Sequence, residues 1–272
     1  MTQANAGTLN SFSRLIATLE SGGGSFAITL PSDWLQGRTA YGGLSAALCL
    51  EATLRAFPDL PPLRSAQFSF VAPATGVLRI AVNILRQGKS TVFTTADLEG
   101  ENGVAARATF CFGVGRSIAR EYANVPSPTA PRLEECPPYF TWPNQPNFRQ
   151  HFEGRLAAGA RTGTPGCPPE MLVWARHRDE DVSGGPVSLL ALADALPPAA
   201  LIMFSEPPPI STMTWSIDML DAEPASTTGW WLVKCAVDSV HEGYSAQQTI
   251  IWNSDGRPIL VARQNVAIFE KK

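Results

Sequence analysis

The sequence predicts an α+β protein made of two similar units in tandem, each an antiparallel sheet wrapped around a buried helix. The first observation behind this is an internal repeat. The turn sequence RQGKS at 86–90 is matched by HEGYS at 241–245, 155 residues later, and ENGVAARA is matched by SDGRPILVARQ at almost the same offset. An offset of this size indicates duplication of a unit of about 120 residues.

Two helical segments are apolar on nearly every face. The pair Gly42-Gly43 opens LSAALCLEATLRAF at 44–57, and the pair Gly184-Gly185 opens PVSLLALADAL at 186–196, in which Asp194 is the only charge. A helix that is apolar all round is buried. We therefore place both helices on the concave face of a curved antiparallel sheet.

Strand-like runs follow each helix. Leu78, Ile80 and Val82 alternate with polar or small residues, which is the period of a half-buried strand. Asn102-Gly103 and Asp255-Gly256 are hairpin turn signals. We expect the four strands of each half to form an antiparallel meander. The predicted strands are 64–73, 78–84, 91–100 and 103–114, then 210–220, 231–237, 244–254 and 257–269.

A segment rich in proline separates the two halves. Residues 116–149 contain seven Pro and little periodicity. Loops of this length are uncommon inside one compact domain. We therefore predict an N-terminal unit at 1–115, a linker at 116–149 and a C-terminal unit at 150–272.

Composition excludes several classes of protein. Charged residues make up 17% of the chain, the net charge is −3, and no basic block exceeds two residues, so we expect no nucleic-acid partner. Neither Cys-x-x-Cys nor His-x-x-x-His occurs, so we expect no metal site, and the five Cys are interpreted as reduced thiols. The first twenty residues lack the pattern of a signal peptide, and the apolar stretch 186–204 is interrupted by Asp194 and two prolines. We expect a cytoplasmic protein without a membrane segment.

The ordered series of segments resembles the acyl-CoA thioesterase II family and the thioesterase-like superfamily around it, which have a double hotdog fold. The resemblance implies an acyl-CoA thioesterase that forms a homodimer or a higher homo-oligomer. The segments that carry it are YGGLSAALCLEATLRAF, LRSAQFSFVAPATG and RQGKSTVFTTADLEG, then FEGRLAAG, MLVWARHRD, LLALADALPPA, STMTWSIDML, WWLVKCAVDS and SDGRPILVARQNVAIF.

The resemblance also implies three catalytic residues that together hold a water. They fall on Asp194 in LLALADALPP, Thr212 in TMTWS and Gln264 in VARQN. A carboxylate can take a proton from water, and Thr and Gln can position that water, so no metal or other cofactor is required. Thr214 stands where some members have Asp, and a short segment with three prolines at 207–209 precedes Thr212; we expect both differences to affect the shape of the pocket.

Each candidate residue also has a structural interpretation. Asp194 could form a salt bridge with Arg176 or Arg178, or lie at a helix end open to water. Thr212 and Gln264 alone would be ordinary strand residues.

The glycine pair and one histidine also have structural interpretations. Gly42 and Gly43 could polarise a thioester carbonyl at the helix N-terminus, or could simply permit a tight approach to the helix. His241 lies in a turn and is interpreted as solvated.

The first half lacks the three residues. The repeat places Ala52 opposite Asp194, Ala108 opposite Gln264, and either Ser65 or Ala66 opposite Thr212. We therefore expect one active site in each chain.

Two other functions stay open. One is a binding module for acyl-CoA or an acyl carrier without catalysis. The other is an acyl-CoA hydratase or dehydratase, although the Asp-x-Asn-Pro-x-His string typical of that chemistry is absent. Thiol release from acyl-CoA esters distinguishes the thioesterase from both.

Overall fold

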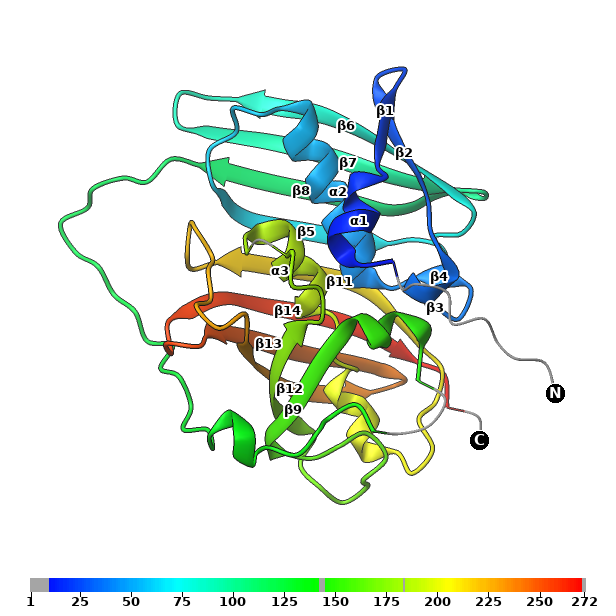
Figure 1. Cartoon of the computed structure of the whole chain (residues 1–272), viewed down its shortest axis with the longest axis vertical. Helices are drawn as coiled ribbons and strands as arrows, with labels where there is room; N and C mark the ends of the chain where they lie inside the picture. The colour runs from blue at the N-terminus through cyan, green and yellow to red at the C-terminus, as the bar shows by residue number, and fades with distance from the viewer. Residues whose placement is uncertain (1–9, 142–144, 183, 271–272) are drawn as a thin grey trace.

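The strands join into one continuous antiparallel sheet instead of the two separate sheets expected. The computed structural model describes residues 10–141, 145–182 and 184–270. Within these residues twelve strands follow the order β1-β2-β6-β7-β8-β5-β11-β14-β13-β12-β10-β9 (Figure 1). The two halves of the sheet meet where β5 (Leu63–Phe70) pairs with β11 (Ile210–Met219).

The junction between the halves is part of the core. Phe68 on β5 is paired with Trp215 on β11, and both side chains are buried. Their ring centroids lie 5.5 Å apart. One main cluster of buried apolar residues extends through both halves, so the halves share a hydrophobic core.

All eight predicted strands are present, but the predicted meander is wrong for the first strand of each four. β5 pairs with β8 instead of β6, and β11 pairs with β14 instead of β12. Hairpin turns join β6 to β7 and β7 to β8, whereas the longer connection 71–76 lets β5 reach the far side of β8. The other strands of these two sets are β6 (Val77–Gln87), β7 (Thr91–Gly100), β8 (Gly103–Gly113), β12 (Trp231–His241), β13 (Tyr244–Asn253) and β14 (Pro258–Ile268).

Each half also contributes two strands to the main sheet before its buried helix, where no strand was predicted. They extend the sheet at both edges. They are β1 (Glu20–Gly22) and β2 (Ser25–Thr29) in the first half, and β9 (Phe152–Gly159) and β10 (Glu170–His177) in the second; β3 (Leu35–Gln36) and β4 (Thr39–Ala40) form a separate small ribbon.

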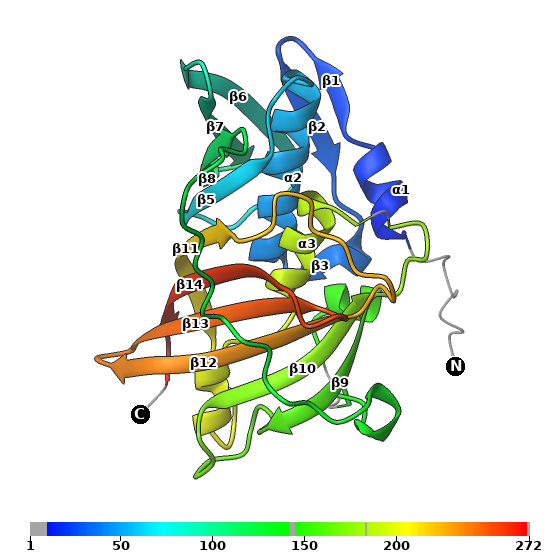
Figure 2. The same ribbon diagram turned by 90° about the vertical axis from the view of Figure 1, so that its left-hand side faces the viewer.

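The two predicted helices are buried and pack against each other on the same side of the sheet (Figure 2). Helix α2 (Gly42–Ala56) lies over β6, β7 and β8. Helix α3 (Pro186–Ala193) is shorter than predicted, because the proline pair at 197–198 disfavours helical backbone before it. Asp194 is therefore the C-cap of α3 and not a residue inside the helix.

Shorter helices complete the second half and the flanks. η4 (Ala199–Met203) follows α3 and contacts β10, β12 and β13. The others are α1 (Phe12–Ala17), η1 (Ser32–Trp34), η2 (Leu133–Glu135) and η3 (Asn147–His151).

The segment predicted as a linker runs across the outer face of the second half (Figure 2). Val125 accepts a hydrogen bond from Trp252 Nε1 at 3.0 Å. Val125 and Ala130 pack against the buried cluster of Leu172, Leu232 and Trp252. Residues 142–144 of the segment lie outside the described residues, and the domain boundaries stay predictions.

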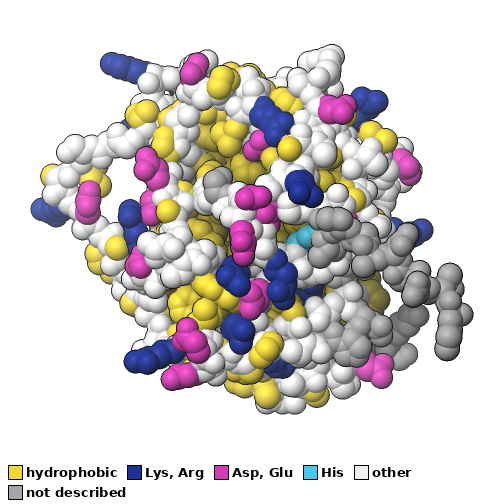
Figure 3. Space-filling model, in the orientation of Figure 1, with side chains coloured by type: hydrophobic (Ala, Val, Ile, Leu, Met, Phe, Trp, Pro, Cys, Tyr) yellow, Lys and Arg dark blue, Asp and Glu magenta, His cyan; other side chains and the backbone are white. Residues whose placement is uncertain are grey.

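The surface carries charges of both signs. On the face shown in Figure 3, Lys and Arg side chains are interspersed with Asp and Glu. Within the described ranges, no helix combines the length and the apolar character needed to cross a membrane.

Candidate active site

The carboxylate of Asp194 is held by groups from two other elements. Its Oδ2 accepts a hydrogen bond from the backbone N–H of Gly43 at 2.8 Å, at the N-terminus of α2. Its Oδ1 accepts a hydrogen bond from Gln264 Nε2 on β14 at 2.7 Å. Helix α3 ends directly before Asp194, so the side chain extends from the end of that helix toward α2 and β14. The structure therefore brings together two of the three predicted residues, Asp194 and Gln264.

Burial sets the acidity of this carboxyl. Removal from water raises the pKa of Asp194 to about 6, although the hydrogen bonds from Gln264 and Gly43 and the positive charge of Arg149 act in the opposite direction. Arg149, on η3, is itself buried, and burial lowers its pKa to about 10, so it stays cationic at neutral pH. Sequence analysis did not single out Arg149.

Of the two structural interpretations of Asp194, the position at a helix end is found, because Asp194 is the C-cap of α3, whereas the salt bridge with Arg176 or Arg178 does not occur. Arg176 pairs with Glu153 at 2.8 Å, and Arg178 Nε donates to the backbone oxygen of Phe152 at 3.0 Å. The carboxylate is held by an amide side chain and a backbone N–H, and not by either of these arginines.

The two glycines are required by close approach to Asp194. A Cβ on Gly42 would lie 2.8 Å from Asp194 Oδ2, and a Cβ on Gly43 would lie 2.8 Å from the backbone oxygen of Ala191. Real Cβ atoms do not approach other atoms so closely, so Ala at either position would force a shift. The structural interpretation of the pair accounts for both glycines, and the N–H of Gly43 is occupied by Asp194 instead of facing a substrate.

Thr212 faces the same cavity as Asp194 but does not bond to it. Both residues line the cavity, and no hydrogen bond within the described ranges joins Thr212 Oγ1 to Asp194 or Gln264. A bulge in β11 lies between Thr212 and Thr214. Thr214 is exposed and is not among the lining residues, so the expectation that it affects the shape of the cavity is wrong.

The cavity itself has a volume of about 810 Å³ and walls that are mostly apolar. Asp194, Arg149 and Thr212 are among the polar residues that line it. The prolines at 207–209 line it, as expected for the segment before Thr212. The apolar lining includes Phe70, Ala74, Ala105, Phe148, Leu196, Leu201 and Ile210.

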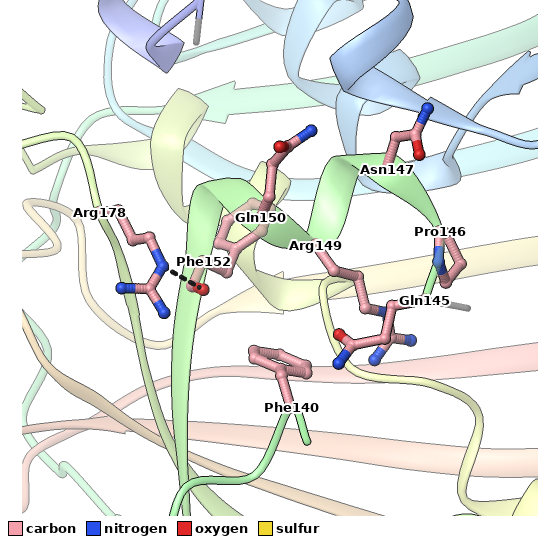
Figure 4. A pocket seen from close by; sticks show the side chains of 8 residues that line it. All are labelled: Phe140, Gln145, Pro146, Asn147, Arg149, Gln150, Phe152 and Arg178. Carbon is pink, nitrogen blue, oxygen red and sulfur yellow. Dashed lines mark hydrogen bonds between the residues drawn. The ribbon is translucent and has the colours of Figure 1, made fainter. Parts of the chain in front are cut away.

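A second hollow adjoins this cavity at Arg149. It has a volume of about 360 Å³, and Pro146 and Arg149 line both spaces. Figure 4 shows Arg149 and Arg178 entering it from opposite sides of Phe152. The hollow is open and is lined mainly by polar side chains.

A residue that sequence analysis missed, Gln247 on β13, continues the hydrogen-bond chain. Its Nε2 donates to Gln264 Oε1 at 3.0 Å, and its side chain is 3% exposed. The signal was present in the sequence, because Ser245, Gln247 and Thr249 place three polar residues at alternate positions of a strand whose counterpart has Thr94, Ala96 and Leu98.

Neither His241 nor a metal site adds to the candidate active site among the described residues. His241 is the last residue of β12, beside the turn, and is 82% exposed, as expected for a solvated residue; its Nε2 lies 3.8 Å from Glu242 Oε1. No group of three or more His, Cys, Asp or Glu in the described part of the chain is arranged to hold a metal ion.

The register of the first half identifies the residues that correspond to the site. Ala108 pairs with Ala96 on β7 as Gln264 pairs with Gln247 on β13. Phe110, two residues after Ala108, pairs with Ala66, as Val266 pairs with Thr212. The open choice between Ser65 and Ala66 is thereby decided for Ala66, and each of these counterparts is an alanine.

Comparison with known proteins agrees with this architecture. Residues 130–268 match the family model of the acyl-CoA thioesterase C-terminal domain, and residues 30–113 match that of the N-terminal domain. A search of curated proteins found no match.

Solved structures extend the comparison to nearly the whole chain. A conserved protein of unknown function with a hot dog fold from Alicyclobacillus acidocaldarius is 22% identical, with a TM-score of 0.84 over 95% of this chain and 98% of its own. A TesB protein from Mycobacterium avium subspecies paratuberculosis is 17% identical, with a TM-score of 0.77 over 96% and 100%. The acyl-CoA thioesterase II TesB2 from Mycobacterium marinum is 15% identical, with a TM-score of 0.73 over 94% and 98%. These likenesses establish a hotdog fold.

Proposed function

This chain belongs to the acyl-CoA thioesterase family, and we propose that it hydrolyses acyl-CoA thioesters with a water activated by Asp194. The observation that carries this proposal is a carboxylate at the wall of a large apolar cavity, held by two hydrogen bonds, whose pKa burial raises to about 6. A general base is most effective when its pKa is close to the working pH, and such a base contributes about 10² to 10⁴-fold to a rate.

The reaction needs no covalent intermediate. Asp194 takes a proton from the water as the water oxygen bonds to the thioester carbonyl carbon. The tetrahedral intermediate then breaks its C–S bond, and the departing sulfur takes the proton back from Asp194. The products are the free acid and the thiol of CoA, and the carboxylate is restored.

Thr212 and Gln264 take supporting parts in this proposal. Gln264 holds one oxygen of Asp194, which leaves the remaining lone pairs of the carboxylate for the water. Thr212 lines the same cavity, so its hydroxyl can orient the water or the thioester from the side of β11.

The N-terminus of α2 supplies a positive end to the site. The N-cap residue Tyr41 makes no side-chain cap hydrogen bond to this terminus, Asp194 accepts the N–H of Gly43, and Gly42 lines the cavity. Unsatisfied N–H groups and the helix dipole favour negative charge at such a position. We therefore assign Gly42 N–H to the oxygen of the thioester carbonyl, and Gly43 N–H to Asp194.

We infer further that the two halves are duplicated hotdog units that share one sheet. The mirrored strand order and the matching registers of β7–β8 and β13–β14 support this interpretation. The homodimer or higher oligomer implied by the family resemblance stays part of the proposal.

Release of thiol from acyl-CoA esters of several chain lengths tests the proposed function. Wild type should release thiol and free acid in equal amounts, and Gln264→Leu should reduce kcat because the carboxylate loses a donor. Binding of the same esters is measured in parallel. A protein that binds the esters and releases no thiol would be a binding module, and the thioesterase proposal would then fail.

A further inference from the structure

Gln247 lies one strand beyond Gln264, on the side away from Asp194. Its backbone is directly opposite that of Gln264 in the β13–β14 register, and its Nε2 donates to Gln264 Oε1 at 3.0 Å. Its side chain is 3% exposed, and it is not among the described residues that line the cavity. Gln247 therefore touches Gln264 in the core and does not reach a substrate.

The hydrogen-bond chain has one permitted direction when Asp194 is ionised. An ionised carboxylate can only accept hydrogen bonds, so Gln264 must present its NH₂ group to Asp194. The carbonyl oxygen of Gln264 then points the other way and requires a donor. The NH₂ group of Gln247 is that donor.

We propose that Gln247 is a positioning residue that keeps the carboxamide of Gln264 turned with its NH₂ group toward Asp194. The inference rests on the proposed function, because it assigns Gln247 to the same site. It goes beyond the three residues implied by family resemblance, since Gln247 acts on the carboxylate only through Gln264.

The other groups near Asp194 keep their charge while the carboxyl titrates. Arg149 on η3 stays cationic, since its pKa is about 10. Tyr41 before α2 and Cys235 on β12 stay neutral, because burial raises the pKa of both, that of Cys235 to about 11. Between about pH 5 and pH 8, Asp194 is therefore the group in this set that changes charge.

Two substitutions of Gln247 should shift the titration of Asp194. Gln247→Leu removes the donor to Gln264 Oε1 and frees the carboxamide to rotate. Gln247→Glu, in its ionised form, places a group there that only accepts hydrogen bonds, which favours the reversed carboxamide and turns an oxygen toward Asp194. The hydrogen bond from Gln264 stabilises the ionised form of Asp194, so its loss should raise the titration midpoint of Asp194 by about one pH unit. The increase should be larger in Gln247→Glu than in Gln247→Leu.

The experiment measures the midpoint in two independent ways. One is the pH profile of kcat for thiol release, and the other is the ¹³C NMR titration of the Asp194 carboxyl, which requires no turnover. Thr249→Val is the matched control, because Thr249 is two residues along on the same face of β13 and contacts Cys235 Sγ at 3.5 Å instead of Gln264. Gln247→Leu should also lower kcat about 10-fold with little change in KM, since the residue does not touch substrate.

The outcomes separate the two proposals. Raised midpoints in both Gln247 variants and an unchanged midpoint in Thr249→Val support the positioning role. Midpoints equal to that of wild type would overturn it, and Gln247→Leu carries the test if the glutamate variant does not fold. If wild type releases no thiol while the NMR midpoint still shifts in Gln247→Leu, the proposed function fails and the orientation of Gln264 by Gln247 stands.

Discussion

The two halves of the sheet have the same strand order and register but different side chains beneath their helices. In the second half, Gln264 and Gln247 lie opposite each other and connect to Asp194. In the first half the opposite pair is Ala108 and Ala96, and both are fully buried.

The difference shows that the same fold forms with or without the polar residues of the candidate site. The Gly-pair offset and the strand registers place Ala52 and Ala66, which are also buried, opposite Asp194 and Thr212. Four alanines pack one half, and four polar residues build a candidate active site at the corresponding positions of the other.

The largest effect is expected when the charge of the second half is placed in the first. Ala52→Asp would bury a carboxylate without the donors that Asp194 has, because the N–H of Gly185 donates to the backbone oxygen of Pro224 and Ala108 offers no side-chain donor. We expect the free energy of unfolding to fall by about 3 kcal/mol or more, measured by urea denaturation. Ala119→Asp in an exposed segment is the control and should be close to wild type. Equal stability of the two variants would contradict the assignment of Ala52 to a dry core.

A second test compares the glycine pairs that open the two helices. Gly42→Ala should lower kcat/KM about 100-fold, because its Cβ would displace the Asp194 carboxylate, and small displacements of a catalytic group are costly. Gly184→Ala is the counterpart in the other half, where the nearest atom to the new Cβ is 3.4 Å away. Its activity should stay near that of wild type. Similar losses in both variants would indicate a general effect on the helices.

The pH profile should show the ionisation of one carboxyl. Burial raises the pKa of Asp194 to about 6, and only the ionised form can take a proton from water. The rate should therefore rise tenfold for each pH unit below about 6 and level off above it, when kcat/KM for an acyl-CoA ester is measured from pH 4.5 to pH 8. A rate that is already constant at pH 4.5 would exclude a base with this pKa.

The smallest effect is expected at Thr214. Its side chain is exposed and outside the cavity lining, so Thr214→Ala should leave kcat/KM unchanged and alter the free energy of unfolding by less than about 0.5 kcal/mol. Thr212→Val, of nearly the same shape as threonine, is the comparison and should lower kcat/KM about 10-fold. If Thr214→Ala were the more damaging change, the assignment of these two positions to opposite faces of β11 would be wrong.

Much of the fold could be predicted because its signals are local. The eight strands are predicted from alternation, as over Leu78, Ile80 and Val82, and from turn signals such as those at 102–103 and 255–256. Which strand pairs with which is a long-range property, so the partners of β5 and the joining of β5 to β11 could not be read from alternation. The strands before each helix were missed for a related reason, since β1 is exposed along its length and β9 lacks regular alternation.

The residues of the candidate site also divide into those that the sequence predicts and those that only the tertiary structure brings together. Asp194 could be predicted because a charge in an apolar helical segment is unusual. Thr212 and Gln264 could be predicted only from the family resemblance. Gln247 and Arg149 come near Asp194 only through tertiary structure, across β13–β14 and from η3. No spacing in the sequence relates them to Asp194.

Thiol release by Asp194→Asn tests the central claim most directly. The substitution keeps the shape of the side chain and removes the base, so kcat should fall by about 10² to 10⁴-fold while the esters still bind. Asp221→Asn is the matched control, a buried carboxylate whose Oδ2 pairs with Arg257 at 3.1 Å, and it should keep the wild-type kcat. A wild-type rate in Asp194→Asn would contradict the account, because no other group in this network could then be the base.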